Sequence, residues 1–183
     1  MENVNIFKTG VRIFRPHEVR MLLGAIPKVE YKNKFEALLF TGMRYNEMKW
    51  LYRNPNHFNG NTILLPSLKT RARHKERYVR LNEHGKRAVQ YFLASKKNLP
   101  SRSGWDNNLK RWCKLAGIDP AGVCAKTTRK TWESWLVTMY PTSTTLIFLS
   151  QGHTDLVSME YYLMLPFSEE DKQEMRFYTD GWI

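Results

Sequence analysis

Residues 38–48 read LLFTGMRYNEM, an apolar run that passes through a glycine into a polar segment. The apolar positions before the glycine recur at helical spacing, at Tyr31, Phe35, Leu38 and Leu39. Gly42 follows them at the place where a left-handed C-terminal cap commonly ends a helix. The sequence therefore predicts one helix that ends at Gly42 and a second, short helix over residues 44–51.

The stretch from about residue 57 to residue 81 changes from helical spacing to strand spacing. Asn59-Gly60 is typical of a tight turn, residues 61–65 read as a strand, and residues 76–81 alternate between apolar and charged side chains. The segment between the two strands is rich in cations, namely Lys69, Arg71, Arg73 and Lys75. These features predict a small antiparallel β-sheet with a cationic connecting loop.

Helical spacing dominates the rest of the chain. It covers residues 15–26, 83–96, 105–115 and 126–139, and shorter helices are expected near residues 144–149 and 155–163. Ser168 and the acidic residues after it resemble a capping box that starts a last helix. We therefore expect a single domain, residues 1–183, that is mainly α with a small antiparallel β-sheet (an α+β fold).

The composition indicates an intracellular protein that meets a polyanion. The 183 residues suit one domain, and 29 Lys and Arg against 17 Asp and Glu give a formal net charge of +12. This surplus favours nucleic acid, because each cation near a phosphate releases condensed counterions, although an anionic membrane surface would also match the charge. The sequence contains no apolar run long enough to span a membrane and no secretory leader. Cys113 and Cys124 have no metal-ligand spacing and are expected to be small buried side chains.

The polar residues that could form a site are each ambiguous when taken alone. An arginine at a helix start, such as Arg44, is usually a surface residue, and Lys69 in a basic loop is usually a solvated charge. Lys126 and Arg129 would fit the polar first turn of an amphipathic helix, and Tyr162 would fit a core aromatic. Only their order and context favour a functional interpretation.

Four segments, in this order, resemble the signature boxes of the tyrosine recombinase family. The first is Thr41-Gly42-Met43-Arg44 with Glu47 in the following turn, and the second is Lys69 at the start of the hairpin loop. Lys126-Thr127-Thr128-Arg129 is similar to the third, a (His/Lys)-x-x-Arg box. The fourth is Leu149-Ser150-Gln151-Gly152-His153, followed by Tyr162. Residues 14–19 and 112–118 also resemble the family, so the resemblance covers nearly the whole chain.

The resemblance implies a fold, a reaction and a set of roles. The fold would be that of a tyrosine recombinase catalytic domain, which cleaves and rejoins DNA through a 3′-phosphotyrosyl intermediate without a metal ion or cofactor. The implied catalytic residues are Tyr162 as nucleophile, Arg44 and Arg129 as phosphate clamps, Lys126 and His153 as further donors, and Lys69 as general acid. Glu47 would orient Arg44. The residues expected to contact the DNA backbone are Arg71, Arg73, Lys75 and Lys130.

The family also implies partners and a domain organisation. We expect double-stranded DNA as the partner, with self-association to a tetramer in the synaptic complex and a monomer or dimer when free. Residues 14–164 would form the catalytic core. Residues 1–13 are too short for the family's separate DNA-clamping domain, which we therefore expect to be absent from this chain. Residues 165–183 would be a tail exchanged between protomers, with packing on its own domain as the alternative.

Some positions depart from the family pattern. Lys126 stands where histidine is more common, and lysine is a poor proton shuttle at neutral pH, which favours Lys69 as the general acid. Ser150-Gln151 varies the usual Leu-Gly-His, and Tyr161 is a competing nucleophile that is less well spaced from His153. A continuous helix turns through about 900° from His153 to Tyr162, which would point them in opposite directions. We therefore expect His153 to lie in a loop before the helix that bears Tyr162, with Gly152 allowing the bend.

Two other functions stay open on the sequence. The chain could be a DNA-binding module that keeps the recombinase scaffold without strand exchange, or a topoisomerase IB-like enzyme that relaxes DNA with the same tyrosine chemistry. Every matched position carries a workable side chain, which disfavours the DNA-binding module without strand exchange. The expected function is that of a recombinase of a virus or mobile element.

Overall fold

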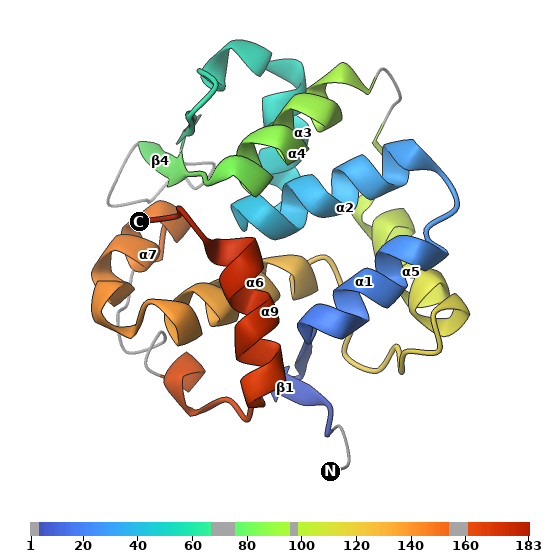
Figure 1. The fold of residues 1–183 in the computed structure, drawn as a ribbon. Coiled ribbons are helices and arrows are strands. Elements are labelled where there is room, and N and C mark those ends of the chain that lie inside the picture. Colours follow the sequence, from blue (N-terminus) through green and yellow to red (C-terminus); the bar gives the residue numbers. More distant parts are fainter. Residues whose placement is uncertain (1–3, 67–75, 96–98, 154–160) are drawn as a thin grey trace.

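The computed structural model describes residues 4–66, 76–95, 99–153 and 161–183, which form helices around one buried core (Figure 1). The described helices are α1 (Pro16–Ala25), α2 (Val29–Thr41), α3 (Tyr45–Arg53), α4 (Glu83–Ala94), α5 (Arg102–Leu115), α6 (Thr127–Met139), α7 (Thr144–Gln151) and α9 (Glu169–Thr179). Short 3-10 helices are η1 (Pro55–His57), η2 (Pro141–Ser143) and η3 (Tyr161–Met164). The strands are β1 (Ile6–Lys8), β2 (Val11–Ile13), β3 (Thr62–Pro66) and β4 (Glu76–Arg80). The predicted α+β fold is confirmed.

Helix α6 runs through the centre of the molecule. Apart from Lys130, its residues from Thr127 to Val137 are buried, and the helix contacts α2, β2, α7, α9 and η3. A helix that is covered on all sides is a core helix, so a charged side chain on it must find its partners inside the protein. This placement determines the surroundings of Arg129 and Glu133, both of which α6 carries. Among the described residues, no helix has the length and apolar character that crossing a membrane requires.

The predicted break between two helices at Gly42 is present. Helix α2 ends there in the left-handed conformation, at φ 63°, and α3 begins after Arg44. The Glu47 carboxylate accepts a hydrogen bond from the Arg44 backbone N–H at 2.7 Å, as in a capping box. Gly42 is also a point of close approach, since a Cβ on it would lie 2.1 Å from Oε1 of Gln151 on α7.

Gly42→Ala should therefore destabilise the protein, whereas Gly24→Ala in α1 should not. Alanine at residue 42 would be strained by the positive φ and would collide with Gln151, so we expect the free energy of unfolding to fall by about 2–4 kcal/mol. Gly24 is helical with open space where its Cβ would be, and its replacement should raise the free energy by up to about 1 kcal/mol. Urea unfolding of both variants measures the difference. Equal stabilities would show that the α2–α7 contact is not as tight as described.

The described residues contain two antiparallel strand pairs, of which one was predicted. Strands β3 and β4 pair antiparallel, from Thr62 opposite Arg80 to Pro66 opposite Glu76. Asn59 closes the turn before β3, where its side-chain oxygen accepts hydrogen bonds from the backbone N–H groups of Asn61 and Thr62. The cationic residues 67–75 lie outside the described residues. The second pair, β1 and β2, has strands of three residues each, too short to produce a readable alternation, and it packs against α6.

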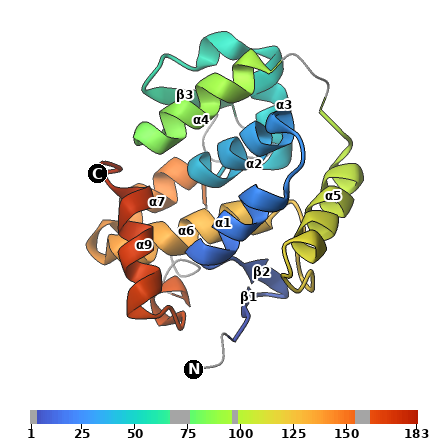
Figure 2. The same ribbon diagram turned by 45° about the vertical axis from the view of Figure 1, so that its right-hand side comes forward.

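The C-terminal tail packs on its own domain in this single chain. Helix α9 begins with the predicted capping box at Ser168 and lies against α6 and α1 (Figure 2). Met175 and Trp182 are fully buried, and Trp182 donates a hydrogen bond from its indole N–H to the Arg80 carbonyl at 3.1 Å. The Asn82 amide donates to the Tyr178 and Asp180 carbonyls. Exchange of the tail between protomers stays a prediction.

Candidate active site

Arg129 lies at the meeting point of three helices. Its guanidinium on α6 is buried, and it donates to the carbonyl of Gly42 at 2.9 Å, to the carbonyl of Gln151 and, through Nε, to Glu133 at 2.8 Å. Gly42 caps α2 and Gln151 ends α7, so the negative ends of two helix dipoles face this cation. Burial lowers the pKa of Arg129 and Glu133 raises it, but a guanidinium stays charged at neutral pH.

Arg44 extends from the same region toward solvent. Its guanidinium donates to Oε1 of Glu47 at 2.8 Å and to the Gly152 carbonyl at 3.3 Å, and 42% of its side chain is exposed. Burial raises the pKa of Glu47, but the positive charges of Arg77 and Arg44 lower it by more. The pKa of Glu47 therefore lies below its usual range. Glu47 is therefore an ionised carboxylate that holds Arg44 at the surface, where the remaining N–H groups of Arg44 can meet an anion.

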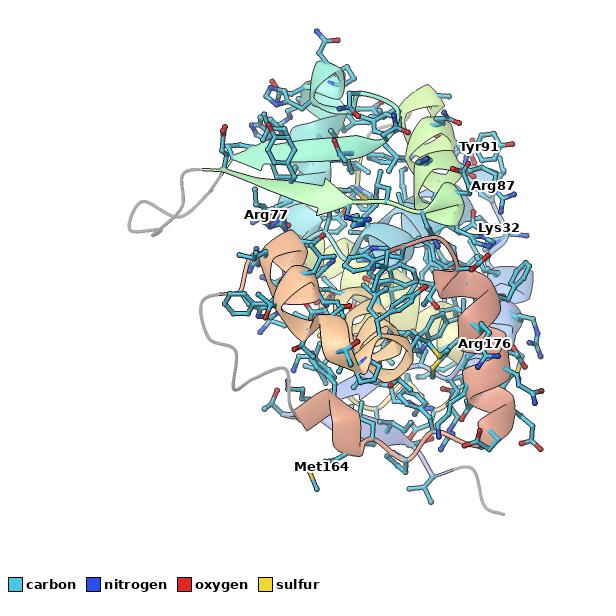
Figure 3. The ribbon with its side chains drawn as sticks, turned by 60° about the vertical axis from the view of Figure 1, so that its left-hand side comes forward. Lys32, Arg77, Arg87, Tyr91, Met164 and Arg176 are labelled. Atoms are coloured by element: carbon cyan, nitrogen blue, oxygen red, sulfur yellow. The ribbon has the colours of Figure 1, made fainter. Side chains whose placement is uncertain are left out.

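Arg77 is a member of this cluster that sequence reasoning missed. It projects from β4 beside α7, and it donates to Oε2 of Glu47 at 2.8 Å (Figure 3). Its other terminal nitrogen is buried and has no hydrogen-bond partner among the described residues. Burial lowers the pKa of Arg77 to about 10, against the opposing effect of Glu47. Gly152 makes room for it, because a Cβ there would lie 2.3 Å from Nε of Arg77.

Glu133 is the second residue that sequence reasoning missed, and it connects the rest of the cluster. The side chain is 1% exposed. Its Oε1 accepts from Nε of Arg129 at 2.8 Å and from Nε2 of His153 at 2.7 Å, and its Oε2 accepts from the Tyr162 hydroxyl at 2.9 Å. A faint signal was present, because Glu133 is an acidic residue between tryptophans, one helical turn after Arg129.

The contacts of Glu133 determine the protonation of its neighbours. Burial raises its pKa, but Arg129 and the hydrogen bonds from His153 and Tyr162 outweigh burial and bring the pKa to about 2. Glu133 is therefore ionised at neutral pH and can only accept hydrogen bonds. It follows that Nε2 of His153 carries a hydrogen. The 3.2 Å approach of an Arg129 nitrogen to that Nε2 is then a contact between two donors.

Tyr162 lies inside this cluster and is almost inaccessible. It belongs to η3, it is 2% exposed, and the Lys8 ammonium lies 3.7 Å from the centre of its ring. Burial raises the pKa of its hydroxyl, and the neighbouring Glu133 raises it further. Tyr162 is thus a neutral hydrogen-bond donor in this arrangement. The side chain of Tyr161, the competing candidate, is not described.

The predicted site residues fall into three groups. The structure brings together Arg44, Glu47, Arg129, His153 and Tyr162, and His153 lies outside a helix, directly after Gly152 at φ 65°. Lys126 is exposed at the N-terminus of α6, and Lys130 donates to the Lys8 carbonyl at 2.8 Å, next to the cluster. The predicted residues Lys69, Arg71, Arg73 and Lys75 lie outside the described residues. No group of His, Cys, Asp or Glu among the described residues could hold a metal ion.

Solved structures share this fold. The chain is similar to XerA recombinase with a TM-score of 0.64 and 18% identity, over 92% of this chain and 65% of that one. For XerH site-specific recombinase in a post-cleavage complex with its difH substrate, the TM-score is 0.63 and the identity 19%, over 96% and 54% of the two chains. For the Tn1549 transposon integrase in complex with circular intermediate DNA, the values are 0.66 and 14%, over 93% and 68%.

The chain spans 65% of XerA recombinase and 54% of XerH, so it corresponds to part of each. No family model and no curated protein matches the sequence. The chain therefore shares its fold with these recombinases over 92–96% of its length, although only 14–19% of the residues are identical. The chain has the fold of a tyrosine recombinase catalytic domain.

Proposed function

We propose that this chain is the catalytic domain of a site-specific DNA recombinase that cleaves and rejoins DNA through a 3′-phosphotyrosyl intermediate. One observation carries the proposal: Arg129 of the third box and His153 and Tyr162 of the fourth meet at one carboxylate, with Arg44 of the first box nearby at the surface. The fold of the solved recombinases supports it. Arg129 and His153 lie on the same carboxylate as the Tyr162 hydroxyl, so the donors that a phosphate would need are close to the proposed nucleophile.

The proposed reaction is a transesterification. The Tyr162 oxygen attacks phosphorus, and the bond from phosphorus to the 5′ oxygen breaks. The tyrosine gives up its hydroxyl proton and the departing oxygen takes one up, so no net proton is consumed. The covalent link keeps the energy of the phosphodiester, and a 5′-hydroxyl of another strand can reverse the step without a nucleotide cofactor.

The proposed roles follow from the donors that each residue has. Arg44 and Arg129 would stabilise the charge that develops on the non-bridging oxygens, since the guanidinium fork suits a phosphate. Lys126 and His153 would add hydrogen bonds to the same oxygens. Lys69 would protonate the 5′ oxygen. The proposed contacts to the DNA backbone are Arg71, Arg73, Lys75 and Lys130.

Double-stranded DNA is the proposed partner. The net charge of +12 supports it, and so do the DNA complexes of XerH and of the Tn1549 integrase. We further propose that the protein acts inside the cell, that it assembles as a tetramer on DNA, and that it serves a virus or mobile element.

Covalent trapping tests the function. The target sequence is unknown, so the protein is incubated, in the presence of a chelator, with a pool of nicked suicide duplexes of randomised sequence. We expect a denaturation-resistant adduct, and sequencing the trapped duplexes gives the target site. DNA binding without any adduct would contradict the proposal and favour the idle DNA-binding module. An adduct that supports only relaxation of supercoiled DNA, without strand transfer to a second duplex, would favour the topoisomerase IB-like alternative.

A further inference from the structure

The carboxylate of Glu133 occupies the donors that the proposed reaction assigns to phosphate. Its oxygens accept from Arg129 at 2.8 Å and from His153 at 2.7 Å, and they also hold the Tyr162 hydroxyl at 2.9 Å. We propose that Glu133 is a positioning residue that keeps the resting site closed until a DNA phosphate takes over these donors. This inference rests on the proposed function and adds a control of the same site.

A phosphate and Glu133 compete for the same groups. Both are anions with oxygen acceptors, and the guanidinium fork recognises either one. Arg129 already donates to Glu133 and to the carbonyls of Gly42 and Gln151, and His153 uses its Nε2–H on Glu133. The Glu133 carboxylate and a phosphate bound to the same donors would repel each other, and the repulsion is stronger where water is excluded. Arrival of the phosphate therefore favours release of Glu133 from His153 and Tyr162.

The nucleophile cannot reach phosphorus in the resting arrangement. An attacking oxygen must come within about 3–3.5 Å of its target, and Tyr162 is 2% exposed. Its hydroxyl is bonded to Glu133, and its ring lies under the Lys8 ammonium of β1. Lys130 of α6 donates to the Lys8 carbonyl and to Oγ1 of Thr9, which holds the hairpin in place. Release of the Tyr162 hydroxyl by Glu133 is therefore a required step before attack.

Nitration of tyrosines by tetranitromethane, read by peptide mapping, tests this role without DNA. Tyr78 and Tyr91 are internal references, since they are 62% and 54% exposed and Tyr91 points outward from α4 (Figure 3). In the wild-type protein we expect Tyr162 to react far more slowly than either reference. Glu133→Gln should raise the rate at Tyr162 about tenfold or more, because a charge-assisted hydrogen bond is lost. The matched control Glu169→Gln, at an 82% exposed carboxylate, should behave as wild type.

If Glu133→Gln does not fold, all its tyrosines should react at similar rates. A second variant covers this case. Glu133→Asp keeps a charge beside Arg129 but shortens the side chain by one methylene, so it should also release Tyr162. Selective nitration of Tyr162 in either variant supports the inference, whereas a general loss of structure would raise the reactivity of the other buried tyrosines as well. If Tyr162 in the folded variants stays as slow as in wild type, Glu133 does not hold it.

The nitration test of Glu133 and the covalent-trapping test of the proposed function can fail independently of each other. Nitration needs no DNA, so absence of a covalent adduct in the wild-type protein would contradict the recombinase function and leave the nitration result to decide on Glu133. A wild-type adduct together with unchanged nitration in folded Glu133→Gln and Glu133→Asp would overturn only the role of Glu133.

Discussion

Tyr162→Phe should abolish the covalent DNA adduct, with a loss of at least about 10⁴-fold in the rate of adduct formation. Phenylalanine has no oxygen with which to attack phosphorus. The variant should still fold, because the ring keeps its buried place and, among the described residues, the Tyr162 hydroxyl bonds only to Glu133. Glu133 keeps its bonds from Arg129 and His153 to Oε1, so its negative charge stays paired. Gel analysis of adducts with the trapped duplexes, beside a urea unfolding curve, measures both effects.

Tyr161→Phe is the matched control for this change. Tyr161 is adjacent in sequence, and its replacement removes an identical hydroxyl. We expect the Tyr161→Phe protein to form adducts as wild type does. If instead Tyr161→Phe lost the adduct and Tyr162→Phe kept it, the nucleophile would be Tyr161 and the cluster around Glu133 would be structural.

Arg129→Ala should reduce both activity and stability. Loss of a donor to the developing charge should slow adduct formation by about 10²–10³-fold. The change also leaves the buried Glu133 without its main counter-charge and the carbonyls of Gly42 and Gln151 without a donor. We expect the free energy of unfolding to fall by about 3–5 kcal/mol. Adduct kinetics below the unfolding transition, together with urea unfolding, measure the two losses.

Two further variants separate the contributions of Arg129. Arg129→Lys keeps a positive charge near Glu133 but lacks the planar fork, so stability should partly recover while the rate stays low. Arg111→Ala removes an exposed arginine that contacts Asn108 and should change stability by no more than about 0.5 kcal/mol. Cleavage at the wild-type rate by Arg129→Lys would mean that Arg129 serves only as a counter-charge inside the fold.

Much of the fold could be predicted because its signals are local. Gly42 marks the end of α2 by a backbone conformation that glycine favours, and Asn59-Gly60 marks a turn by side-chain hydrogen bonds to nearby backbone groups. The β1–β2 hairpin escaped prediction because its strands are three residues long and depend on contacts far along the chain. One such contact is the hydrogen bond from the Arg12 backbone N–H to the Gly122 carbonyl.

The site could be predicted only in part, for a related reason. Motif order pointed to Arg44, Arg129, His153 and Tyr162, and the structure places these four together. Glu133 and Arg77 escaped prediction because their importance lies in partners remote in sequence, such as Tyr162 for Glu133 and Glu47 for Arg77. In a linear pattern, each is one more charge on a helix or strand.

The two helix ends that face Arg129 make the alignment of its side chain depend on the packing of α2 and α7. The guanidinium is oriented by the terminal carbonyls of α2 and α7, so its alignment requires both helices to be docked on α6. A chain whose α7 has come away would also lose the backbone next to His153 and Gly152. Under the proposed function, such a half-assembled molecule would be unable to nick DNA. The arrangement would thereby make DNA cleavage depend on the completed packing of α2 and α7 on α6.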